Sequence, residues 1–331
     1  MKRGERGIAL LLSLLVMVLL TVIVIEFTFS TQVDYRRAAM WVNGRRAALV
    51  ADGGVMLASE VLRQDSLFGI TDSLSDIWAR ELPPIDTGAG MLSVRIEDEQ
   101  SKLNLNTLAT GALSPAGRQF QSLLDKLQLD PSLAYPLADW LDKNHDPGPG
   151  LGAEDDWYAS ATPPYLPRNG MMRSYAELAL VRGFTPAVLA KIRRFTTVLP
   201  ELDLKVNINT APAEVLRVVE PRLDNEQLVQ ALIAARAQNP FTNAAAVAAV
   251  PGMNAFSEQE IERLFSFSTR WFRVRSTGDV GGAMRSTEAL LQRDGGTSKI
   301  VYLLPRRGPN IVGLDSGIRT RIDDFSLLGT K

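Results

Sequence analysis

The sequence predicts an α+β protein in which a long N-terminal transmembrane helix packs on an antiparallel sheet, with a large all-α domain inserted between the strands. An apolar run occupies residues 8–25, and strand-like alternation is found at residues 92–105 and again at 271–304. The chain between the two strand-like regions carries several helix start signals. Because sheet edges must be paired or covered, strands on both sides of a helical block predict one discontinuous sheet with an inserted domain.

These features divide the 331 residues into six consecutive segments. They are a leader at 1–7, an N-terminal helix at 8–66 with its membrane span at 8–29, the first part of the sheet domain at 67–106, the inserted α-domain at 107–266, the completion of the sheet domain at 267–305 and a flexible tail at 306–331. The tail is polar and aperiodic, which predicts a segment without packed structure.

The composition is that of a globular protein and leaves few routes to catalysis. Hydrophobic residues make up 46% of the chain, and the formal net charge of -1 gives no reason to expect a polyanion-binding surface. The absence of cysteine removes disulfides and thiolate chemistry. His145 is the single histidine, which removes most support for Ser-His-Asp chemistry and for zinc sites of the usual kind, which need several His or Cys ligands. Since no catalytic motif is present, we expect a protein that is not an enzyme.

The apolar run at residues 8–25 is interrupted only by Ser13 and Thr21 and measures about 27 Å as a helix, which matches a bilayer core. A secretory signal peptide would end in a small-x-small cleavage site, and the residues after Ile25 do not supply one. The run is therefore expected to span a membrane. Basic residues flank it on both sides, so charge alone does not settle its orientation. They are Lys2, Arg3, Arg6, Arg36, Arg37, Arg45 and Arg46.

The leader Met-Lys-Arg-Gly-Glu-Arg-Gly, followed abruptly by an apolar helix, resembles a type IV prepilin signal. The resemblance implies that a prepilin peptidase cuts between Gly7 and Ile8, which leaves Ile8 as the new, methylated N-terminus. Most members of that superfamily carry glutamate at the fifth mature residue, where this chain has Leu12. Within the type II secretion proteins, the lack of this glutamate is typical of the minor pseudopilin called general secretion pathway protein K.

Four further segments occur in an order similar to that of the protein K family. They are Asp139-Trp140-Leu141-Asp142, Gly152-Ala153-Glu154-Asp155-Asp156, Ser174-Tyr175-Ala176-Glu177-Leu178 and Val206-Asn207-Ile208-Asn209-Thr210-Ala211-Pro212. The resemblance implies a minor pseudopilin of the type II secretion system. Such a protein crosses the bacterial inner membrane once, with its N-terminus cytoplasmic before assembly and its globular domain in the periplasm.

The same resemblance implies a position and a set of partners. The subunit would form the tip of the pseudopilus and help to initiate its assembly for the export of folded proteins. A head of this size is also hard to repeat along a densely packed filament, which agrees with the tip. The implied partners are minor pseudopilins I and J, other pseudopilins of the filament, the prepilin peptidase, the inner-membrane assembly platform and membrane lipid.

Small residues recur at spacings of three and four beyond the membrane span. They are Gly44, Ala47, Ala51, Gly54 and Ala58. These spacings place them along one face of a helix, where another backbone can approach closely. We expect this stripe to pack on the protein's own sheet; packing on neighbouring pseudopilin helices is the alternative.

The strands and helices of the outer region are predicted from alternation and from start signals. Leu92 to Ile96 alternate before the polar stretch 97–101, and Leu103 and Leu105 alternate after it, which predicts a hairpin. Three later strands, separated by Gly281-Gly282 and Gly295-Gly296 turns, are expected at Trp271–Thr277, Ala283–Leu291 and Lys299–Leu304. Helix starts in the inserted domain are predicted at Ser114-Pro115, Ser174–Glu177, Thr185-Pro186 and Ser257–Glu260.

An acidic loop rich in Gly and Pro contains the candidate metal ligands. They are Asp142, Asn144, Asp146, Glu154, Asp155 and Asp156. The alternation at 142, 144 and 146 suits a hard cation such as calcium, but Pro147 stands where an EF-hand has its glycine. A solvated loop in which Asp142 or Asp155 caps a helix is the alternative. The protein K resemblance implies calcium, and His145 is expected beside the ligands rather than among them, because calcium prefers oxygen.

Residues 206–253 resemble the helix-hairpin-helix repeat of DNA-uptake receptors, so a membrane-anchored DNA receptor is the main alternative function. In such a module, helix N-termini and glycine-rich hairpins hold phosphates. Residues 203–265 contain five basic and eight acidic residues, a net charge of -3, and Asn254 replaces the second hairpin glycine. Phosphate binding depends largely on Lys and Arg, so we expect this helical fold without nucleic-acid binding.

Overall fold

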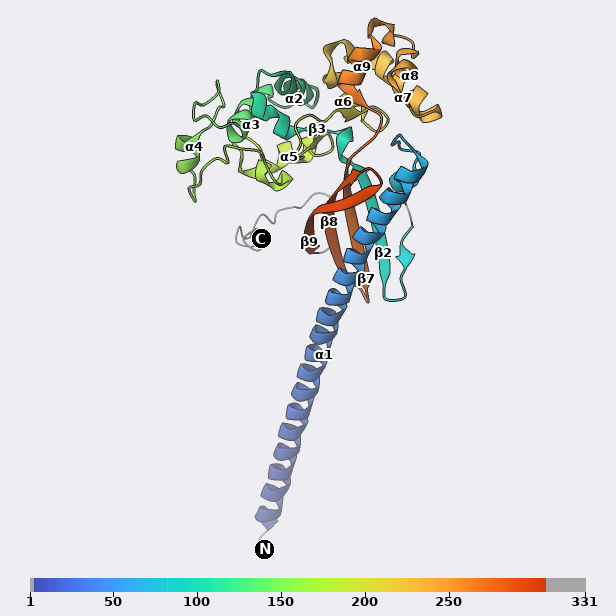
Figure 1. The fold of residues 1–331 in the computed structure, drawn as a ribbon. Coiled ribbons are helices and arrows are strands. Elements are labelled where there is room, and N and C mark those ends of the chain that lie inside the picture. The colour runs from blue at the N-terminus through green and yellow to red at the C-terminus, as the bar shows by residue number, and fades with distance from the viewer. Residues whose placement is uncertain (1–2, 82, 308–331) are drawn as a thin grey trace, which may run out of the picture.

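The computed structural model describes residues 3–81 and 83–307, and its longest element is an N-terminal helix (Figure 1). Helix α1 runs from Arg3 to Phe68, 66 residues, and therefore measures about 99 Å at 1.5 Å per residue. Its N-terminal half stands free of the rest of the chain, and its C-terminal part lies against the sheet (Figure 1). The predicted long N-terminal helix is confirmed, and it continues without a break from the apolar run into the head.

The C-terminal part of α1 packs on a five-stranded sheet in the order β1-β2-β7-β8-β9, in which neighbouring strands are antiparallel. The strands are β1 (Ile85–Asp86), β2 (Met91–Asp98), β7 (Trp271–Val280), β8 (Ala283–Asp294) and β9 (Thr297–Arg307). Gly281 and Gly282 join β7 to β8, and Gly295 and Gly296 join β8 to β9, all with positive φ. Glycine adopts this conformation without strain, which explains why the three predicted C-terminal strands and their turns are confirmed.

The hairpin predicted between β2 and the segment at Leu103 and Leu105 is wrong. β2 pairs with β1 and β7, whereas β3 (Leu103–Asn104) pairs in parallel with β4 (Thr196–Thr197) of the inserted domain. The chain leaves the sheet at Asp98, where β2 ends. Both leucines are buried in the core of the inserted domain. Alternation identified a strand at Leu103, but it does not identify the element against which the strand packs.

The stripe of small residues lets α1 lie directly on the sheet. Ala47, Ala51 and Ala58 have 0% exposed surface. A Cβ atom at Gly54 would collide with side chains of β2 and β7, and one at Gly278 in β7 would collide with the carbonyl of Ala47. Close contact of this kind requires a residue without a side chain. The predicted packing of the stripe on the protein's own sheet is therefore confirmed.

The inserted domain lies between β2 and β7 and consists mainly of short helices beyond the end of α1 (Figure 1). Its α-helices are α2 (Pro115–Lys126), α3 (Ala134–Leu141), α4 (Asp155–Ala159), α5 (Pro186–Ile192), α6 (Ala213–Val219), α7 (Glu226–Gln238), α8 (Ala244–Ala248) and α9 (Glu258–Leu264). Its 3-10 helices are η2 (Glu99–Ser101), η3 (Leu105–Thr110), η4 (Pro131–Leu133), η5 (Tyr175–Leu180), η6 (Pro221–Leu223) and η7 (Met253–Ala255), while η1 (Ile77–Ala79) precedes the sheet. In a second parallel pair, β5 (Val206–Asn207) pairs with β6 (Phe265–Ser266), so the last residues of the inserted domain lie beside a segment from the middle of its sequence.

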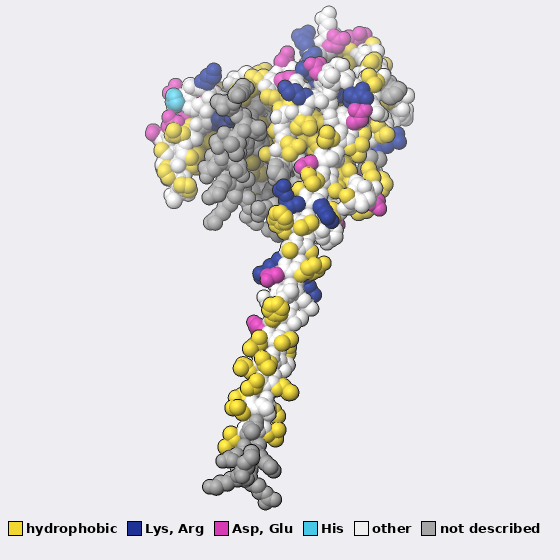
Figure 2. All heavy atoms as spheres, turned by 60° about the horizontal axis from the view of Figure 1, so that its bottom comes forward, with side chains coloured by type: hydrophobic (Ala, Val, Ile, Leu, Met, Phe, Trp, Pro, Cys, Tyr) yellow, Lys and Arg dark blue, Asp and Glu magenta, His cyan; other side chains and the backbone are white. Residues whose placement is uncertain are grey.

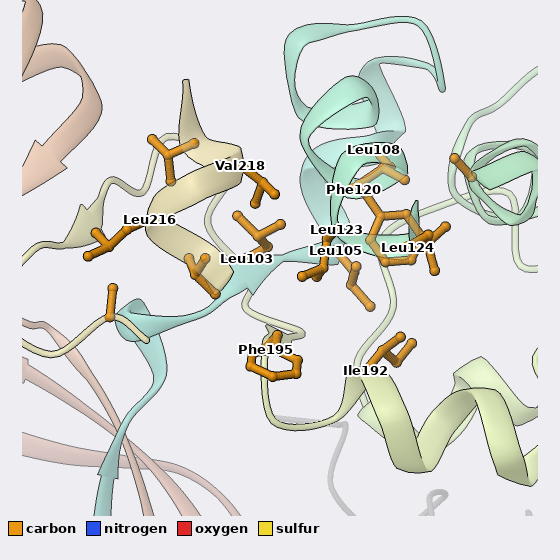
Figure 3. Close-up of a cluster of buried hydrophobic side chains, with 14 of the residues drawn as sticks. Leu103, Leu105, Leu108, Phe120, Leu123, Leu124, Ile192, Phe195, Leu216 and Val218 are labelled. Atoms are coloured by element: carbon orange, nitrogen blue, oxygen red, sulfur yellow. The ribbon is translucent and has the colours of Figure 1, made fainter. Parts of the chain in front are cut away.

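One apolar core runs through the inserted domain. Side chains of β3, η3, α2, α5 and α6 meet in it, among them Phe120, Leu123 and Leu124 of α2 (Figure 3). These three side chains have 0% exposed surface. Burial of this apolar surface is the main contribution to the stability of the domain.

The predicted helix starts are confirmed by their hydrogen bonds. The Ser114 and Thr185 side chains accept from backbone amides three residues on, and each precedes a proline at the first helical position. Capping boxes form at Ser174 and at Ser257, each with the glutamate three residues later. The Ser174 box begins the 3-10 helix η5 rather than an α-helix.

A buried ionic network joins the inserted domain to the sheet. Arg273 in β7 donates to both carboxylate oxygens of Glu99, at 2.9 and 2.8 Å, and to Glu288 in β8 at 2.7 Å. It also donates to the Tyr302 hydroxyl at 2.8 Å, and Lys102 donates to Glu99 at 2.7 Å. Burial would raise the pKa of Glu99, but Arg273 and Lys102 together hold that pKa well below its usual range. The network therefore fixes the start of the insertion to the centre of the sheet.

Two predictions fall at the ends of the described residues. β9 extends to Arg307, so the first two residues of the predicted tail belong to the sheet. Residues 308–331 of that tail and residues 1–2 of the leader lie outside the described residues.

Candidate metal centre and membrane anchor

The acidic loop connects α3, which ends at Leu141, to α4, which begins at Asp155. Trp140 and Tyr158 are both buried and pack edge to face, with ring centroids 5.2 Å apart. This contact holds the two ends of the loop near each other at one edge of the inserted domain (Figure 1). The single histidine lies among acidic side chains at the same edge (Figure 2).

Asp139 and Arg182 shape the second half of the loop. The Asp139 carboxylate, 4% exposed, accepts hydrogen bonds from the amides of Gly148 at 2.9 Å and Ala153 at 2.7 Å. Arg182 donates to the Gly152 carbonyl at 3.0 Å, so the loop is held from two sides. From the sequence, Asp139 was noted only as part of a segment that resembles the protein K family, because its role in the loop depends on amides 9 and 14 residues away.

The alternating residues in the first half of the loop bind the loop's own backbone. Asp142 Oδ1 accepts from the Asn144 amide at 3.1 Å, and Asn144 Oδ1 accepts from the Asp146 amide at 2.7 Å. These successive turns are the local reason why side chains with short oxygen-bearing groups occur at every second position. Asp142 keeps a second carboxylate oxygen that can face a cation.

Glu154 is the most unusual carboxylate of the loop. Its side chain is 5% exposed, and neither carboxylate oxygen has a hydrogen-bond partner among the described residues. Burial, together with the nearby Asp139, Asp142, Asp155 and Asp146, raises the pKa of Glu154 to about 7. A buried carboxylate without a partner is unfavourable unless a proton or a cation compensates it. The loop therefore fits a cation at this position.

Three potential ligands converge on that position. Donor atoms of His145, Glu154 and Asp155 lie within 4.8 Å of one another. His145 Nδ1 is 3.2 Å from Asp155 Oδ2. Asp142 and Asp146 lie close enough to raise the pKa of Glu154. Of the six predicted ligands, the structure brings only Glu154 and Asp155 into this group of described residues, whereas Asp142, Asp146 and the exposed Asp156 are not part of it.

A second acidic group could not be predicted from the sequence, because its acids are far along the chain from Arg293, the cation that pairs with them. Donor atoms of Asp65, Asp72 and Asp76 lie within 4.8 Å of one another. Arg293 in β8 forms ion pairs with Asp65 and Asp72. Burial, together with Asp72 and Asp76, raises the pKa of Asp65 to about 6. Because Arg293 already supplies the compensating charge, we interpret this group as part of the junction between α1 and the sheet.

The membrane anchor is the exposed N-terminal part of α1. The structure contains one helix long and apolar enough to span a membrane among the described residues, with a mean hydropathy of 2.9 over its most apolar window. Ile8 and Leu12 are 68% and 63% exposed, as expected for side chains that face lipid. The predicted cleavage point after Gly7 lies in the first turns of α1, and no observation on the structure tests it.

Three arginines of the helix-hairpin-helix-like part are engaged within the protein. Arg217 pairs with Asp224 and Glu226 at 2.9 and 2.8 Å. Arg222 likewise forms ion pairs with two glutamates, and Arg236 donates to a backbone carbonyl. Arginines whose charge is matched by carboxylates contribute little to phosphate binding. The geometry thus agrees with the negative net charge in arguing against a DNA receptor.

A membrane helix whose outer part packs on a small antiparallel sheet defines this chain as a pilin-like, membrane-anchored subunit. Sequence models of "Type II secretion system (T2SS), protein K" match residues 101–201 and 206–268. The type II secretion system protein K of Pseudomonas aeruginosa is 31% identical over 307 residues, which cover 88% of this chain and 90% of that protein. That of Aeromonas hydrophila is 28% identical and covers 91% of this chain and 96% of that protein. The chain belongs to the type II secretion system protein K family.

A solved structure shares the fold. It is the crystal structure of the GspK-GspI-GspJ complex from the enterotoxigenic Escherichia coli type 2 secretion system, and one of its chains matches with a TM-score of 0.67 at 20% identity. The match covers 84% of this chain and 99% of that chain. The predicted fold class is therefore confirmed, and the comparisons support the secretion function over the DNA receptor.

Proposed function

We propose that this chain is the minor pseudopilin that forms the tip of a type II secretion pseudopilus and helps to initiate its assembly for the export of folded proteins. The observation that carries the proposal is the position of the inserted domain, which lies beyond the end of α1 farthest from the N-terminus (Figure 1). Pseudopilin helices pack side by side in a filament, so a bulky domain beyond the helix end would obstruct a subunit placed above it. Only the last subunit avoids this obstruction.

The N-terminal residues support the same position. The chain is anchored once in the bacterial inner membrane, with its N-terminus cytoplasmic before assembly and its head in the periplasm. A prepilin peptidase cuts between Gly7 and Ile8, and the new amine is methylated. Leu12 has no carboxylate that could pair with the N-terminal amine of the next subunit toward the tip. A subunit at the tip needs no such pair, because no subunit lies ahead of it. Membrane lipid surrounds the exposed apolar part of α1, and the inner-membrane assembly platform receives the subunit from there.

The role is structural rather than catalytic, and its partners are minor pseudopilins I and J together with the other pseudopilins of the filament. The solved relative was crystallised as a complex of three such proteins. The small-residue face of α1 is occupied by the protein's own sheet, so other faces of the helix must meet these partners.

Calcium is the proposed cofactor of the acidic loop. Asp142, Asn144, Asp146, Glu154 and Asp155 would hold the ion, and the unpaired Glu154 carboxylate is the observation that supports it. When bound, calcium would supply positive charge and cross-link the two halves of the loop through oxygen ligands. Asp139 and Arg182 hold the loop in position for this role.

Co-purification tests the proposed function. The full-length chain, expressed together with minor pseudopilins I and J of the same bacterium and extracted in detergent, should elute as one complex with both partners. A Leu12→Ala variant is the matched control, because it keeps an apolar residue at that position and should elute in the same complex. A chain that elutes alone under conditions where I and J bind each other would contradict the proposal.

A further inference from the structure

Four exposed arginines follow the membrane span on the side of the head, and the proposed function gives them no role. The only basic residues between positions 8 and 62 are Arg36, Arg37, Arg45 and Arg46. With a single acid among them, residues 30–46 have a net charge of +3. All four side chains are exposed, and charged side chains lie between the apolar part of α1 and the head (Figure 2). Basic residues usually gather on the cytoplasmic side of a span, so a group on the opposite side calls for a local cause.

These arginines have few partners within the chain. Among the described residues, the one ion pair that any of them forms joins Arg37 to Asp34 at 3.7 Å, between side chains that are 78% and 70% exposed. A long, exposed pair of this kind contributes little. In the head, by contrast, Arg217 and Arg273 are held close to carboxylates. The charge of the four arginines is therefore available to a partner outside the chain.

Distance from the membrane separates the four arginines into two pairs. Arg36 lies about 10 Å beyond Phe29, the last residue of the predicted span, and the headgroup layer occupies about the first 5–7 Å of that distance. Side chains of a helix lean toward its N-terminus, which here is toward the membrane, so Arg36 and Arg37 can reach the headgroups. Arg45 lies about 24 Å beyond Phe29, outside the screening length of about 8 Å.

Tyr35 marks the same depth as the first pair of arginines. Its side chain is 75% exposed on α1, directly before Arg36. Tyrosine is enriched at the boundary between membrane and water, because its ring is apolar and its hydroxyl forms hydrogen bonds. An exposed tyrosine beside two exposed arginines therefore fits a segment of the helix that lies among lipid headgroups.

We propose that Arg36 and Arg37 bind the phosphate groups of anionic phospholipids on the periplasmic face of the inner membrane. The inference rests on the proposed insertion of α1 in that membrane and names the class of lipid that the head-side end of the span contacts. A guanidinium binds phosphate through two parallel N–H donors, and each basic residue near an anionic surface strengthens binding about fivefold. Bound headgroups would hold the head at a fixed height above the membrane until the subunit enters the filament.

Electron paramagnetic resonance of spin-labelled lipids tests this inference on the full-length chain in phosphatidylcholine vesicles. The probes are traces of spin-labelled phosphatidylglycerol and spin-labelled phosphatidylcholine, whose motionally restricted fractions give the ratio of their association constants. The wild-type chain should prefer phosphatidylglycerol. The double variant Arg36→Gln with Arg37→Gln keeps good helix formers at both positions and should lower the ratio by up to about fivefold per arginine. Salt at about 1 M should also lower the wild-type ratio, because the screening length falls to about 3 Å.

The double variant Arg45→Gln with Arg46→Gln is the matched control. It removes the same charge from the same helix about 13 Å farther from the membrane, so it should leave the ratio unchanged. Equal ratios in the wild-type chain and the variant at positions 36 and 37 would overturn the inference. Equal losses in the two double variants would overturn it as well, because the preference would then follow net charge rather than position.

The remaining outcomes separate this inference from the proposed function. If the variant at positions 36 and 37 kept the lipid preference but no longer co-eluted with minor pseudopilins I and J, the two arginines would bind those partners, and the lipid inference would be refuted. Co-elution with I and J in detergent needs no anionic lipid. A wild-type chain that preferred phosphatidylglycerol but did not co-elute would therefore contradict the proposed function and leave this inference supported.

Discussion

The buried network around Arg273 predicts a large loss of stability when that side chain is replaced by methionine. Arg273 forms ion pairs with Glu99 and Glu288, whose side chains are 1% and 2% exposed. After Arg273→Met, Glu99 keeps Lys102 at 2.7 Å, whereas Glu288 keeps Arg275 at the longer distance of 3.6 Å. Breaking a buried ion pair from one side costs about 3–5 kcal/mol, because an uncompensated charge stays behind. We expect a loss within this range.

Urea unfolding of the full-length chain in detergent, followed by tryptophan fluorescence, measures this loss. Trp271, one of the five tryptophans of the chain, begins the strand that carries Arg273 and therefore lies at the junction. Arg95→Met is the matched control, since Arg95 pairs on the same sheet with the exposed Glu81 and with Glu97, and such pairs contribute about 0–1 kcal/mol. If the two variants lost the same free energy of unfolding, the assignment of Arg273 as the cation that fixes the insertion to the sheet would be refuted.

Three further perturbations test other parts of the structure. Because the pKa of Glu154 is raised, the metal-free protein should have the full stabilising contribution of this side chain below about pH 4.5 and lose that contribution as the pH rises through about 7. Melting curves measured in chelator should show this loss of stability, and Glu154→Gln should abolish the pH dependence. An unchanged pH dependence in the variant would contradict the prediction. Ala51→Leu forces a larger side chain between α1 and the sheet and should cost about 1–3 kcal/mol in urea unfolding; an unchanged midpoint would argue against the close contact. Phe120→Ala leaves a cavity in the core of the inserted domain and should lower the free energy of unfolding by about 3–5 kcal/mol, measured in the same way. A loss below about 1 kcal/mol would contradict the burial of Phe120.

Local features of the fold could be predicted because their causes are local. The caps at Ser114, Thr185 and Ser257 depend on residues within one turn, and the glycine turns of the C-terminal strands depend on backbone conformation alone. The close packing of the small-residue stripe was also predictable, since few helix faces need so many small residues unless a backbone lies against them.

Long-range features could not be predicted. The alternation at Leu103 correctly predicted a strand, but not its pairing partner, which lies more than 90 residues later, at Thr196. Glu99 and Arg273 are separated by 174 positions, and a single sequence contains nothing that pairs them. Such contacts depend on how the inserted domain folds back onto the sheet.

The candidate metal centre shows the same limit. Loop position and residue type identified the acids, but the successive turns at residues 142–146 became visible only in the structure. Burial of Glu154 and exposure of the neighbouring Asp156 follow from the direction in which α4 leaves the loop, which the sequence does not specify. His145 was expected beside the ligands, and its Nδ1 lies 3.2 Å from Asp155 Oδ2.

Deletion of this chain from the bacterium that encodes it tests the central claim most directly. The measurement is the amount of a folded protein exported by the type II system that appears in the culture medium, compared with the amount retained in the periplasm. If the chain forms the tip of the pseudopilus, export should stop, the protein should accumulate in the periplasm, and the full-length chain supplied in trans should restore export. Undiminished export from the deletion strain would contradict the account.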